Sequence, residues 1–429
     1  MGGRTLLFLV ISLALAPHLW AGSKYKILHA FAGGSKDGGG LFASVAFDQE
    51  GNLYGTTSGG GRYRSGTVFE LSPNPKGQWL ESILHSFCKL PHCTDGALPM
   101  STPAFDSLGN LYGTTPTVTF EMSPPADQGA GWSFRVIYNA GENADLILDR
   151  ANYLYGTIGA GKYGYGAVTE VFPGPHGWKA KYLYSFCPVN KCPDGDAPTQ
   201  YLSWDLGGSL YGTTTDGGTG QYHLGVAFKV ERTASGWKEH VLHSFPAYQG
   251  DGYPPSSGLA VDSHLNLYGT TVRGGSNGCQ GTGCGTVFEL TRQQDGSWKE
   301  NILYHFPTLK DGAGPEGGLA IDQAGNLYGT AGGGTGPCGG GGCGVVFKMT
   351  PNSNGKWTYT VLHRFVGTDG ALPVAGPTLD SKGNIYGTTS AGGAFGAGVV
   401  YEITGGWPGA PPFPRPLRKG GWRDSQPQN

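Results

Sequence analysis

The sequence repeats nearly the same four residues, Leu-Tyr-Gly-Thr, seven times, with Ile in place of Leu in the last copy. The tyrosines of these copies are 58, 43, 56, 57, 60 and 58 residues apart: Tyr54, Tyr112, Tyr155, Tyr211, Tyr268, Tyr328 and Tyr386. A period of this size indicates a repeat architecture in which each copy is one supersecondary unit. The 429 residues are therefore expected to fold mainly as one array rather than as several ordinary domains.

Each copy has the pattern of four short β-strands, which we call A to D. In the fifth copy, strand A is expected over residues 258–262 and strand B over residues 267–271. A Gly-rich loop follows, and then residues 286–290 alternate β-branched and aromatic side chains, as strand C should. A polar turn leads past Trp298 to strand D over residues 301–306. Four antiparallel strands with Gly, Asn and Asp turns are typical of a propeller blade.

The two ends of the chain predict how the array closes. The seventh copy reaches Trp407 and then continues into the Pro-rich residues 408–416, which cannot pair as a strand D. Residues 25–31 match strand D of the first copy, residues 82–87. The prediction is an all-β, seven-bladed β-propeller with four antiparallel strands per blade, closed by the N-terminal strand joining the last blade. The complementary ends argue against an open array of hairpins.

The composite repeat carries a resemblance to a known family. Its pattern runs Leu-Tyr-Gly-Thr-Thr, Gly-Gly, Gly-Thr-Val-Phe-Glu-Leu, Trp, Leu-His-Ser-Phe, Asp-Gly and Pro. This resembles the Gloeo_Verruco (GloVer) tandem repeat of secreted bacterial proteins, over nearly all of residues 25–405. The resemblance implies an exported, β-propeller-like protein, often with a C-terminal surface anchor, and it brings no catalytic residues. The tail here is polar and Pro-rich, which argues against anchoring.

The N-terminus and the cysteines predict export. Residues 1–21 have the pattern of a signal peptide, with Arg4, an apolar stretch over residues 6–16 and a cleavage site after Ala21. An even number of cysteines in a secreted chain predicts disulfides. The eight cysteines form four pairs of one spacing: Cys88 and Cys93, Cys187 and Cys192, Cys279 and Cys284, and Cys338 and Cys343. We expect an extracellular or periplasmic protein with a propeller over residues 25–405 and a disordered Pro/Gly-rich tail over residues 406–429.

Charge and composition restrict the partners. The formal net charge is −2 and only 14% of the residues are charged, which argues against nucleic-acid or anionic-membrane partners. No later segment is apolar over a length that could cross a bilayer. We expect a monomer whose partner is an extracellular glycan or protein.

Residues present in every copy are expected to serve the blades. Asp residues end all seven A strands and should accept hydrogen bonds from turn amides: Asp48, Asp106, Asp149, Asp205, Asp262, Asp322 and Asp380. Six Asp-Gly turns join strand D to the next strand A: Asp37, Asp95, Asp194, Asp251, Asp311 and Asp369. Turn chemistry is the favoured interpretation, with calcium binding as the alternative; no other cofactor and no metal site is predicted.

Two aromatic sets also repeat in strand D. One position is occupied by His or Tyr, which favours a ring with a polar tip over a general base: His29, His85, Tyr138, Tyr184, His243, Tyr304 and His363. Six tryptophans open strand D and are expected to pack between blades: Trp79, Trp132, Trp178, Trp237, Trp298 and Trp357.

Two loops are missing on the face where a propeller carries its D–A and B–C loops. Tyr112 and Phe120 are 8 residues apart, against 15 between Tyr54 and Phe69, so the second copy lacks its B–C loop. The third copy similarly lacks most of its D–A loop. These neighbouring deletions predict a notch beside the central funnel; repeat decay without function is the equally weighted alternative.

Side chains outside the repeat pattern are the candidate ligand contacts, because exposed rings on loops favour stacking against sugars or protein side chains. They are Tyr63, Tyr163, Tyr165, Tyr222, His223, Tyr253, Phe395, Glu142 and Asp145. The polar residues His92 and Asp216 also lie outside the repeat pattern and fit solvated surface. The sequence thus predicts a secreted module that binds an extracellular glycan or protein on this face. A propeller-type lyase, glycosidase or lactonase is the alternative, and a structural envelope protein a further one; no catalytic residue is predicted.

Overall fold

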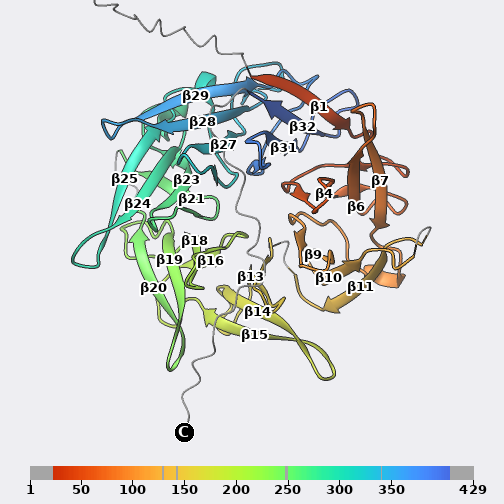
Figure 1. The fold of residues 1–429 in the computed structure, drawn as a ribbon. Helices are drawn as coiled ribbons and strands as arrows, with labels where there is room; N and C mark the ends of the chain where they lie inside the picture. Colours follow the sequence, from red (N-terminus) through yellow and green to blue (C-terminus); the bar gives the residue numbers. More distant parts are fainter. Residues whose placement is uncertain (1–22, 128–129, 142–143, 247–249, 340, 406–429) are drawn as a thin grey trace, which may run out of the picture.

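The computed structural model describes residues 23–127, 130–141, 144–246, 250–339 and 341–405, and they form a seven-bladed β-propeller (Figure 1). Each blade is an antiparallel sheet in which strands A to D follow one another from the axis to the rim. The predicted signal peptide over residues 1–21 and the predicted tail over residues 406–429 lie outside the described residues. No helix in the described part of the chain is long and apolar enough to cross a membrane.

The strands of the first four blades are as follows. Blade 1 has β3 (Ala46–Phe47), β4 (Leu53–Thr57), β6 (Thr67–Pro73) and β7 (Trp79–Ser86). Blade 2 has β8 (Ala104–Phe105), β9 (Leu111–Thr114), β10 (Thr119–Ser123) and β11 (Ser133–Tyr138). Blade 3 has β12 (Ile147–Leu148), β13 (Leu154–Ile158), β14 (Ala167–Gly174) and β15 (Gly177–Ser185). Blade 4 has β17 (Ser203–Trp204), β18 (Leu210–Asp216), β19 (Val226–Thr233) and β20 (Gly236–Ser244), and the additional β16 (Asp196–Pro198).

The remaining blades repeat this order. Blade 5 has β22 (Ala260–Val261), β23 (Leu267–Gly274), β24 (Thr286–Arg292) and β25 (Trp298–His305), and the additional β21 (Gly252–Pro255). Blade 6 has β26 (Ala320–Ile321), β27 (Leu327–Ala331), β28 (Val345–Pro351) and β29 (Trp357–Arg364). Blade 7 has β30 (Thr378–Leu379), β31 (Ile385–Thr389), β32 (Val399–Thr404) and, from the other end of the chain, β1 (Lys24–Ala30).

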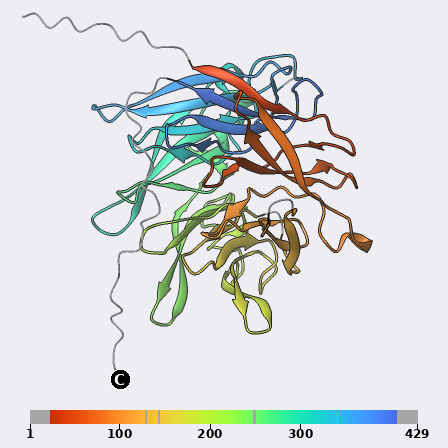
Figure 2. The same ribbon diagram turned by 45° about the vertical axis from the view of Figure 1, so that its right-hand side comes forward.

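The N-terminal strand closes the ring, as the sequence predicts. Strand β1 pairs antiparallel with β32, from Lys24 opposite Thr404 to Ala30 opposite Val399. In the turned view of Figure 2, β1 lies alongside the strands of the last blade. Closure pairs two strands from opposite ends of the chain, so neither is left as an open edge inside the ring.

The Leu-Tyr-Gly-Thr sequence recurs because each of its residues has a packing task. The Leu is fully buried in the core of the blade, as Leu267 is in blade 5. The Gly lies under the aromatic ring of strand C: a Cβ added to Gly269 would lie 2.5 Å from the Phe288 ring. The Thr hydroxyl donates a hydrogen bond to a backbone carbonyl of the next blade, as Thr213 does to Ser257 at 2.7 Å. All seven repeat threonines make this inter-blade bond.

The repeat tyrosine connects the turn of its own blade to the next blade. Its hydroxyl donates to the Asp that ends strand A, as Tyr54 does to Asp48 at 3.1 Å. The other oxygen of Asp48 accepts the amides of Glu50 and Asn52, which confirms the predicted turn role. The Tyr54 ring contacts the first Trp of the next blade, Trp132, with ring centroids 5.7 Å apart. The predicted inter-blade packing of the tryptophans is thereby confirmed.

Strand lengths differ from the prediction at both edges of a blade. Strand A of the fifth blade covers only Ala260–Val261, because the residues before it leave the ladder and contact neighbouring blades. Strand D instead begins at Trp298, three residues earlier than predicted, because the C–D hairpin at the rim stays paired up to Arg292 opposite Trp298. The inner edge of each blade is thus crowded, and the outer edge is free to extend.

The glycine in this motif gives a direct test of the packing. We expect Gly269→Ala to lower the free energy of unfolding by roughly 1 to 3 kcal/mol, because the new methyl group overpacks the Phe288 ring. The matched control is Gly131→Ala, where an added Cβ meets nothing within 4 Å. Urea unfolding measures both; equal midpoints for the two variants would contradict this account of the repeat.

Candidate functional site

The D–A and B–C loops share one face of the ring, which we call the loop face. Short pairings between the two loop types establish this, since β2 (Gly38–Gly39) pairs with β5 (Gly59–Gly60). Strands β16 and β21, both in D–A connections, similarly pair with β18 and β23. All four predicted disulfides are present on this face: Cys88–Cys93, Cys187–Cys192, Cys279–Cys284 and Cys338–Cys343. Disulfides therefore constrain the conformation of four loops on this face.

Seven equivalent positions surround the axis where the chain enters each strand A from the loop face. Each lies four residues before the Asp that ends strand A, and we call the set the axial ring. Its members are Ser44, Thr102, Asp145, Tyr201, Gly258, Gly318 and Gly376. Neighbouring members or their adjacent residues touch: the Ser44 amide donates to the Thr102 hydroxyl at 3.2 Å, and the Thr102 amide donates to Asp145 Oδ1 at 2.6 Å. A Cβ on Gly258 would lie 2.7 Å from the Tyr201 Cβ.

The axial ring is strongly asymmetric. Blades 1 to 4 contribute side chains, and the large or ionisable ones are Asp145 and Tyr201 on the adjacent blades 3 and 4. Blades 5 to 7 contribute only glycine, so backbone lines that side. Glu316 of blade 6 precedes its axial glycine by two residues; the residue as a whole is exposed, while its carboxyl group is partly shielded from solvent. The axis therefore has a side lined by side chains and a side lined mainly by glycine backbone.

Burial and charge shift the proton affinities of the three ionisable groups at the axis. Burial raises the pKa of Asp145 to about 7, although hydrogen bonds from Thr102 favour the charged form. Burial also raises the pKa of Tyr201, and the carboxylates of Asp145 and Glu316 raise it further. Burial raises the pKa of Glu316 as well. The charges of Asp145 and Glu316 thus both act on the Tyr201 hydroxyl, and a pKa of about 7 lets Asp145 release or accept a proton near neutral pH.

The structure places the predicted aromatic residues around the rim of the loop face. Four of them, Tyr63, Tyr163, Tyr222 and Phe395, occupy equivalent B–C loop tips in blades 1, 3, 4 and 7, with 37 to 65% of each residue exposed. Tyr165 and His223 lie in the same loops of blades 3 and 4, and Tyr253 lies in β21. Because these rings belong to five blades, they border the face and do not form one cluster. Glu142 lies outside the described residues.

The two shortened connections adjoin one another, and both flank the axial side chains. In blade 2 the B–C loop is a tight turn in which the Thr115 amide donates to the Val118 carbonyl at 2.9 Å. Gly141, in the shortened D–A connection of blade 3, packs directly on this turn, since its Cβ would lie 2.1 Å from the Thr115 carbonyl oxygen. Asp145 follows in that same connection. The aromatic loop tips of blades 7 and 1 lie on one side of this sector and those of blades 3 and 4 on the other.

The Asp-Gly carboxylates do not gather at the axis. Asp37, Asp95, Asp194 and Asp369 each accept a backbone amide within their own D–A connection. They therefore lie at four different junctions between blades and serve turn chemistry there. One shared calcium site made of this ring of aspartates does not fit the geometry.

Sequence reasoning missed Tyr201 and Glu316. The sequence does contain a signal, which is the alignment of the copies residue by residue. The position four residues before each strand-A Asp varies between copies, from Ser to Tyr to Gly. The predicted Asp145 lies at this position, but as a partly buried axial group rather than as a surface contact.

A hollow of about 560 Å³ lies elsewhere, between blades 5 and 6, lined by residues that include Glu289, Asn301 and Trp357. The Glu289 carboxylate there already accepts hydrogen bonds from Tyr268 and Asn301. The strand-C carboxylate that lines the hollow is therefore already engaged by hydrogen bonds within its own blade.

The fold defines a seven-bladed β-propeller. The chain belongs to the Gloeobacter/Verrucomicrobia repeat family, whose sequence profile matches residues 141–401. The comparison with curated protein sequences gives no match. The four disulfides are consistent with secretion.

Solved structures share the fold at low sequence identity. The extracellular domain of a protein from B. thetaiotaomicron assigned as a hybrid two-component system has a TM-score of 0.53 and 9% identity, covering 87% of this chain and 40% of that one. An ulvan lyase of a polysaccharide lyase family has a TM-score of 0.50 and 10% identity, covering 87% and 94%. A gluconolactonase from Xanthomonas campestris, at a TM-score of 0.41, 14% identity and coverage of 71% and 84%, is too dissimilar to support an argument.

The shifted pKa of Asp145 makes a prediction about stability and pH. Because the folded pKa of about 7 lies above the ordinary value of 3.8, the contribution of Asp145 is most favourable below pH 4 and is lost as the pH rises to 7. Asp145→Asn keeps an acceptor for the Thr102 amide but cannot ionise. We expect the variant to match the wild type at pH 4 and to exceed its stability at pH 8 by roughly 1 to 3 kcal/mol.

Urea midpoints measured from pH 4 to pH 8 test this. Other buried acids titrate identically in both chains, so the difference between wild type and variant isolates Asp145. A difference that does not change with pH would show that Asp145 titrates as an ordinary surface carboxyl group.

Proposed function

We propose that the protein is a secreted binding module that holds an extracellular glycan on its loop face, over the axial ring. The observation that carries the proposal is the convergence of Asp145, Tyr201 and Glu316 at the axis, beside the sector where two loops are missing. Aromatic loop tips border this sector on both sides. A rigid ring of blades that presents variable residues on one face is a suitable scaffold for recognition.

The chemistry of the face favours a carbohydrate over a flat protein surface. Sugar rings present apolar C–H faces that stack on aromatic side chains, and their hydroxyl groups pair with carboxyl groups and backbone amides. The axis supplies a tyrosine under the electrostatic influence of two carboxyl groups, and its glycine side presents backbone. A protein partner would need a continuous apolar patch, whereas the rings here are separated by polar and glycine-rich loops.

A thermal-shift screen against oligosaccharides from plant, algal and bacterial polysaccharides tests the binding. A ligand at about 100 times its Kd adds roughly 2.7 kcal/mol to stability and should raise the Tm by a few degrees. We expect Tyr201→Ala to weaken that ligand at least about tenfold, because a central aromatic anchor is lost. The matched control is Tyr182→Ala, which removes an exposed tyrosine from the outer strand β15.

An equal loss of affinity in both tyrosine variants would show that the ligand does not bind at the axis. Absence of any shift across the glycan classes would favour a protein partner or a structural role in the envelope.

A second candidate function, cleavage of the bound glycan, is favoured by the same three residues. Glycoside hydrolysis needs two carboxyl groups about 5–10 Å apart, and elimination needs a base and an acid at the sugar. Asp145 has a pKa suited to proton transfer at neutral pH. The fold similarity to an ulvan lyase is compatible with this chemistry.

Product analysis separates the two functions. If the protein is an enzyme, the wild type should shorten the glycan identified by the screen, and Asp145→Asn and Glu316→Gln should lower kcat by at least about a hundredfold while still binding. An intact glycan after prolonged incubation with the wild type would leave binding as the function.

A further inference from the structure

A second set of repeated positions lies at the junctions between neighbouring blades, which we call seams. Each seam combines the His or Tyr of one strand D, the Asp of the following Asp-Gly turn where present, and one residue from strand D of the next blade. That third residue always lies four positions before the next His or Tyr. Around the ring from the closing seam, the third residues are Glu81, Phe134, Ala180, Glu239, Glu300, Tyr359 and Tyr25.

In three seams the third residue is aromatic and fills the space by stacking. His85 stacks on Phe134 with ring centroids 3.8 Å apart, and Tyr304 stacks on Tyr359 at 4.1 Å. Tyr25 stacks on His363 at 3.8 Å. In three other seams the third residue is a glutamate, which leaves the facing His or Tyr without a ring partner there. These glutamate seams need a different explanation.

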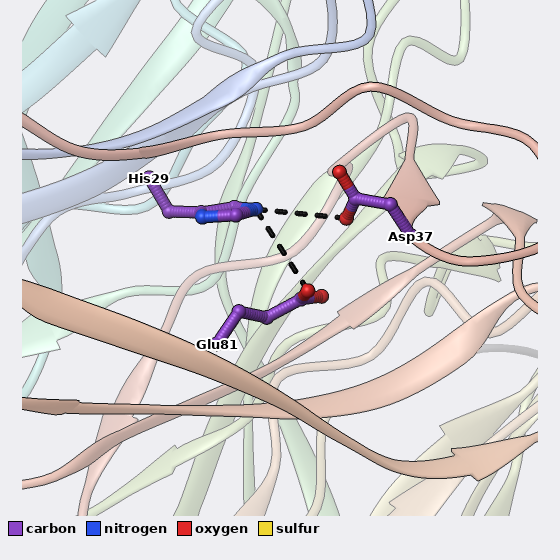
Figure 3. A group of neighbouring side chains, drawn as sticks. All are labelled: His29, Asp37 and Glu81. Atoms are coloured by element: carbon purple, nitrogen blue, oxygen red, sulfur yellow. Dashed lines mark ion pairs between the residues drawn. The ribbon is translucent and has the colours of Figure 1, made fainter.

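The closing seam, between blade 7 and blade 1, brings three potential metal ligands together (Figure 3). His29 comes from the closing strand β1, Asp37 from the connection that follows it, and Glu81 from β7 of blade 1. His29 Nε2 lies 3.5 Å from Asp37 Oδ1 and 3.9 Å from Glu81 Oε2. In Figure 3 both carboxyl groups point at the same imidazole nitrogen.

Two of the atoms at this seam have no hydrogen-bond partner. His29 Nε2 and Glu81 Oε1 are both buried from solvent and unpaired. Asp37, in contrast, is fixed by the amides of Ala32 and Gly38, at 2.7 and 2.6 Å. A cation between the three ligands would satisfy the unpaired atoms and offset the repulsion of the carboxylates.

We propose that the closing seam binds one divalent transition-metal ion, best matched by Zn²⁺, through His29, Asp37 and Glu81. Zn²⁺ takes one imidazole nitrogen and carboxylate oxygens at about 2.0–2.2 Å in a tetrahedron, whose ligand atoms lie about 3.3–3.5 Å apart. The two separations from His29 Nε2 are close to this range. Ca²⁺ would require about six to eight oxygen ligands and is disfavoured by the imidazole.

The ion would hold the closing strand β1 against blade 1. Strand β1 is held to blade 7 by its ladder with β32, and His29 is the point from which it can be tied across the seam to blade 1. Three protein ligands leave a fourth tetrahedral position for water. The inferred role is stabilisation of ring closure, independent of any ligand at the axis.

The other two glutamate seams differ in ways that supply controls. At the seam between blades 4 and 5, His243 Nε2 and Glu300 Oε2 are 3.4 Å apart. At the seam between blades 3 and 4, Tyr184 replaces the histidine and donates to Asp194 at 2.6 Å. Within the described residues, His29, Asp37 and Glu81 form the group whose three ligand atoms lie within 4.8 Å of one another. Glu300 is thus the matched control for Glu81.

The experiment is a titration of the untagged, oxidised full chain with Zn²⁺ after removal of metals by a chelator. Calorimetry and elemental analysis should give one Zn²⁺ per chain for the wild type and for Glu300→Gln. Glu81→Gln and Asp37→Asn should each weaken binding at least about tenfold, since even outer partners of metal ligands contribute that much. Co²⁺ in place of Zn²⁺ should give the visible absorption of a four-coordinate ion in the wild type and in Glu300→Gln, and should lose it in Glu81→Gln and Asp37→Asn.

Hydrogen exchange adds a readout of ring closure. Zn²⁺ should slow exchange of the β1 amides in the wild type and in Glu300→Gln, and should have no effect on Glu81→Gln. The proposal is overturned if the wild-type chain binds no Zn²⁺ at a concentration of about 100 μM, which would saturate a site with a micromolar Kd. It is also overturned if Glu81→Gln binds Zn²⁺ as tightly as the wild type does, or if the site binds Ca²⁺ in preference to Zn²⁺. A variant that fails to fold is recognised by its circular dichroism, and Asp37→Asn then provides the second measurement.

Discussion

The ring depends on one inter-blade contact that is repeated at every seam. The threonine of Leu-Tyr-Gly-Thr crosses to a carbonyl of the next blade, while the preceding tyrosine packs against the next blade's tryptophan. Both residues belong to strand B, which lies in the middle of a blade and is paired on both sides. The contact is therefore made by the most rigid strand, and the geometry of one seam is transmitted to the next. Closure by β1 is possible because seven equal seams return the chain to its start.

The same arrangement explains where variation is tolerated. Residues of strands B and C, the tryptophans and the strand-A aspartates are all occupied by seam and turn contacts, so they recur. The axial ring varies more, from Gly258, Gly318 and Gly376 to Asp145 and Tyr201. Neighbouring axial residues still pack closely, since a Cβ on Gly258 would lie 2.7 Å from the Tyr201 Cβ. The candidate site is therefore an exception that the repeat permits rather than a feature that it creates.

Much of this fold could be predicted from the sequence because its determinants are local or periodic. The Pro-rich end and the extra strand D at residues 25–31 predicted closure, and the Asp turns and paired cysteines predicted their own contacts. The convergence of Tyr201, Asp145 and Glu316 could not be read directly, because these residues occupy different blades and meet only through the curvature of the ring. The closing seam was missed for a similar reason: His29 and Glu81 belong to the D strands of neighbouring blades and meet only when those blades pack together. Strand register, which a search for motifs does not use, is the level at which both sets become visible.

The missing loops of blades 2 and 3 show that loops can be lost while the inter-blade contacts of the strands remain. At that seam Thr114 still donates to the Ala144 carbonyl at 2.8 Å, and Tyr112 still contacts Trp178 with centroids 6.0 Å apart. The inter-blade contacts of the strands are thus intact, and what is absent is the loop-face part: the B–C loop, the Asp-Gly turn and, opposite Tyr138, any side chain larger than Ala180. At the seam between blades 1 and 2 the loops add a further hydrogen bond, from the Leu98 amide to the Ser65 carbonyl at 2.7 Å. At the shortened seam Gly141 instead packs directly against the Thr115 carbonyl. A deletion in a repeat protein is therefore best judged by the inter-blade contacts that remain. Here the strand contacts between blades 2 and 3 remain, and the loops beside the axial side chains are shorter.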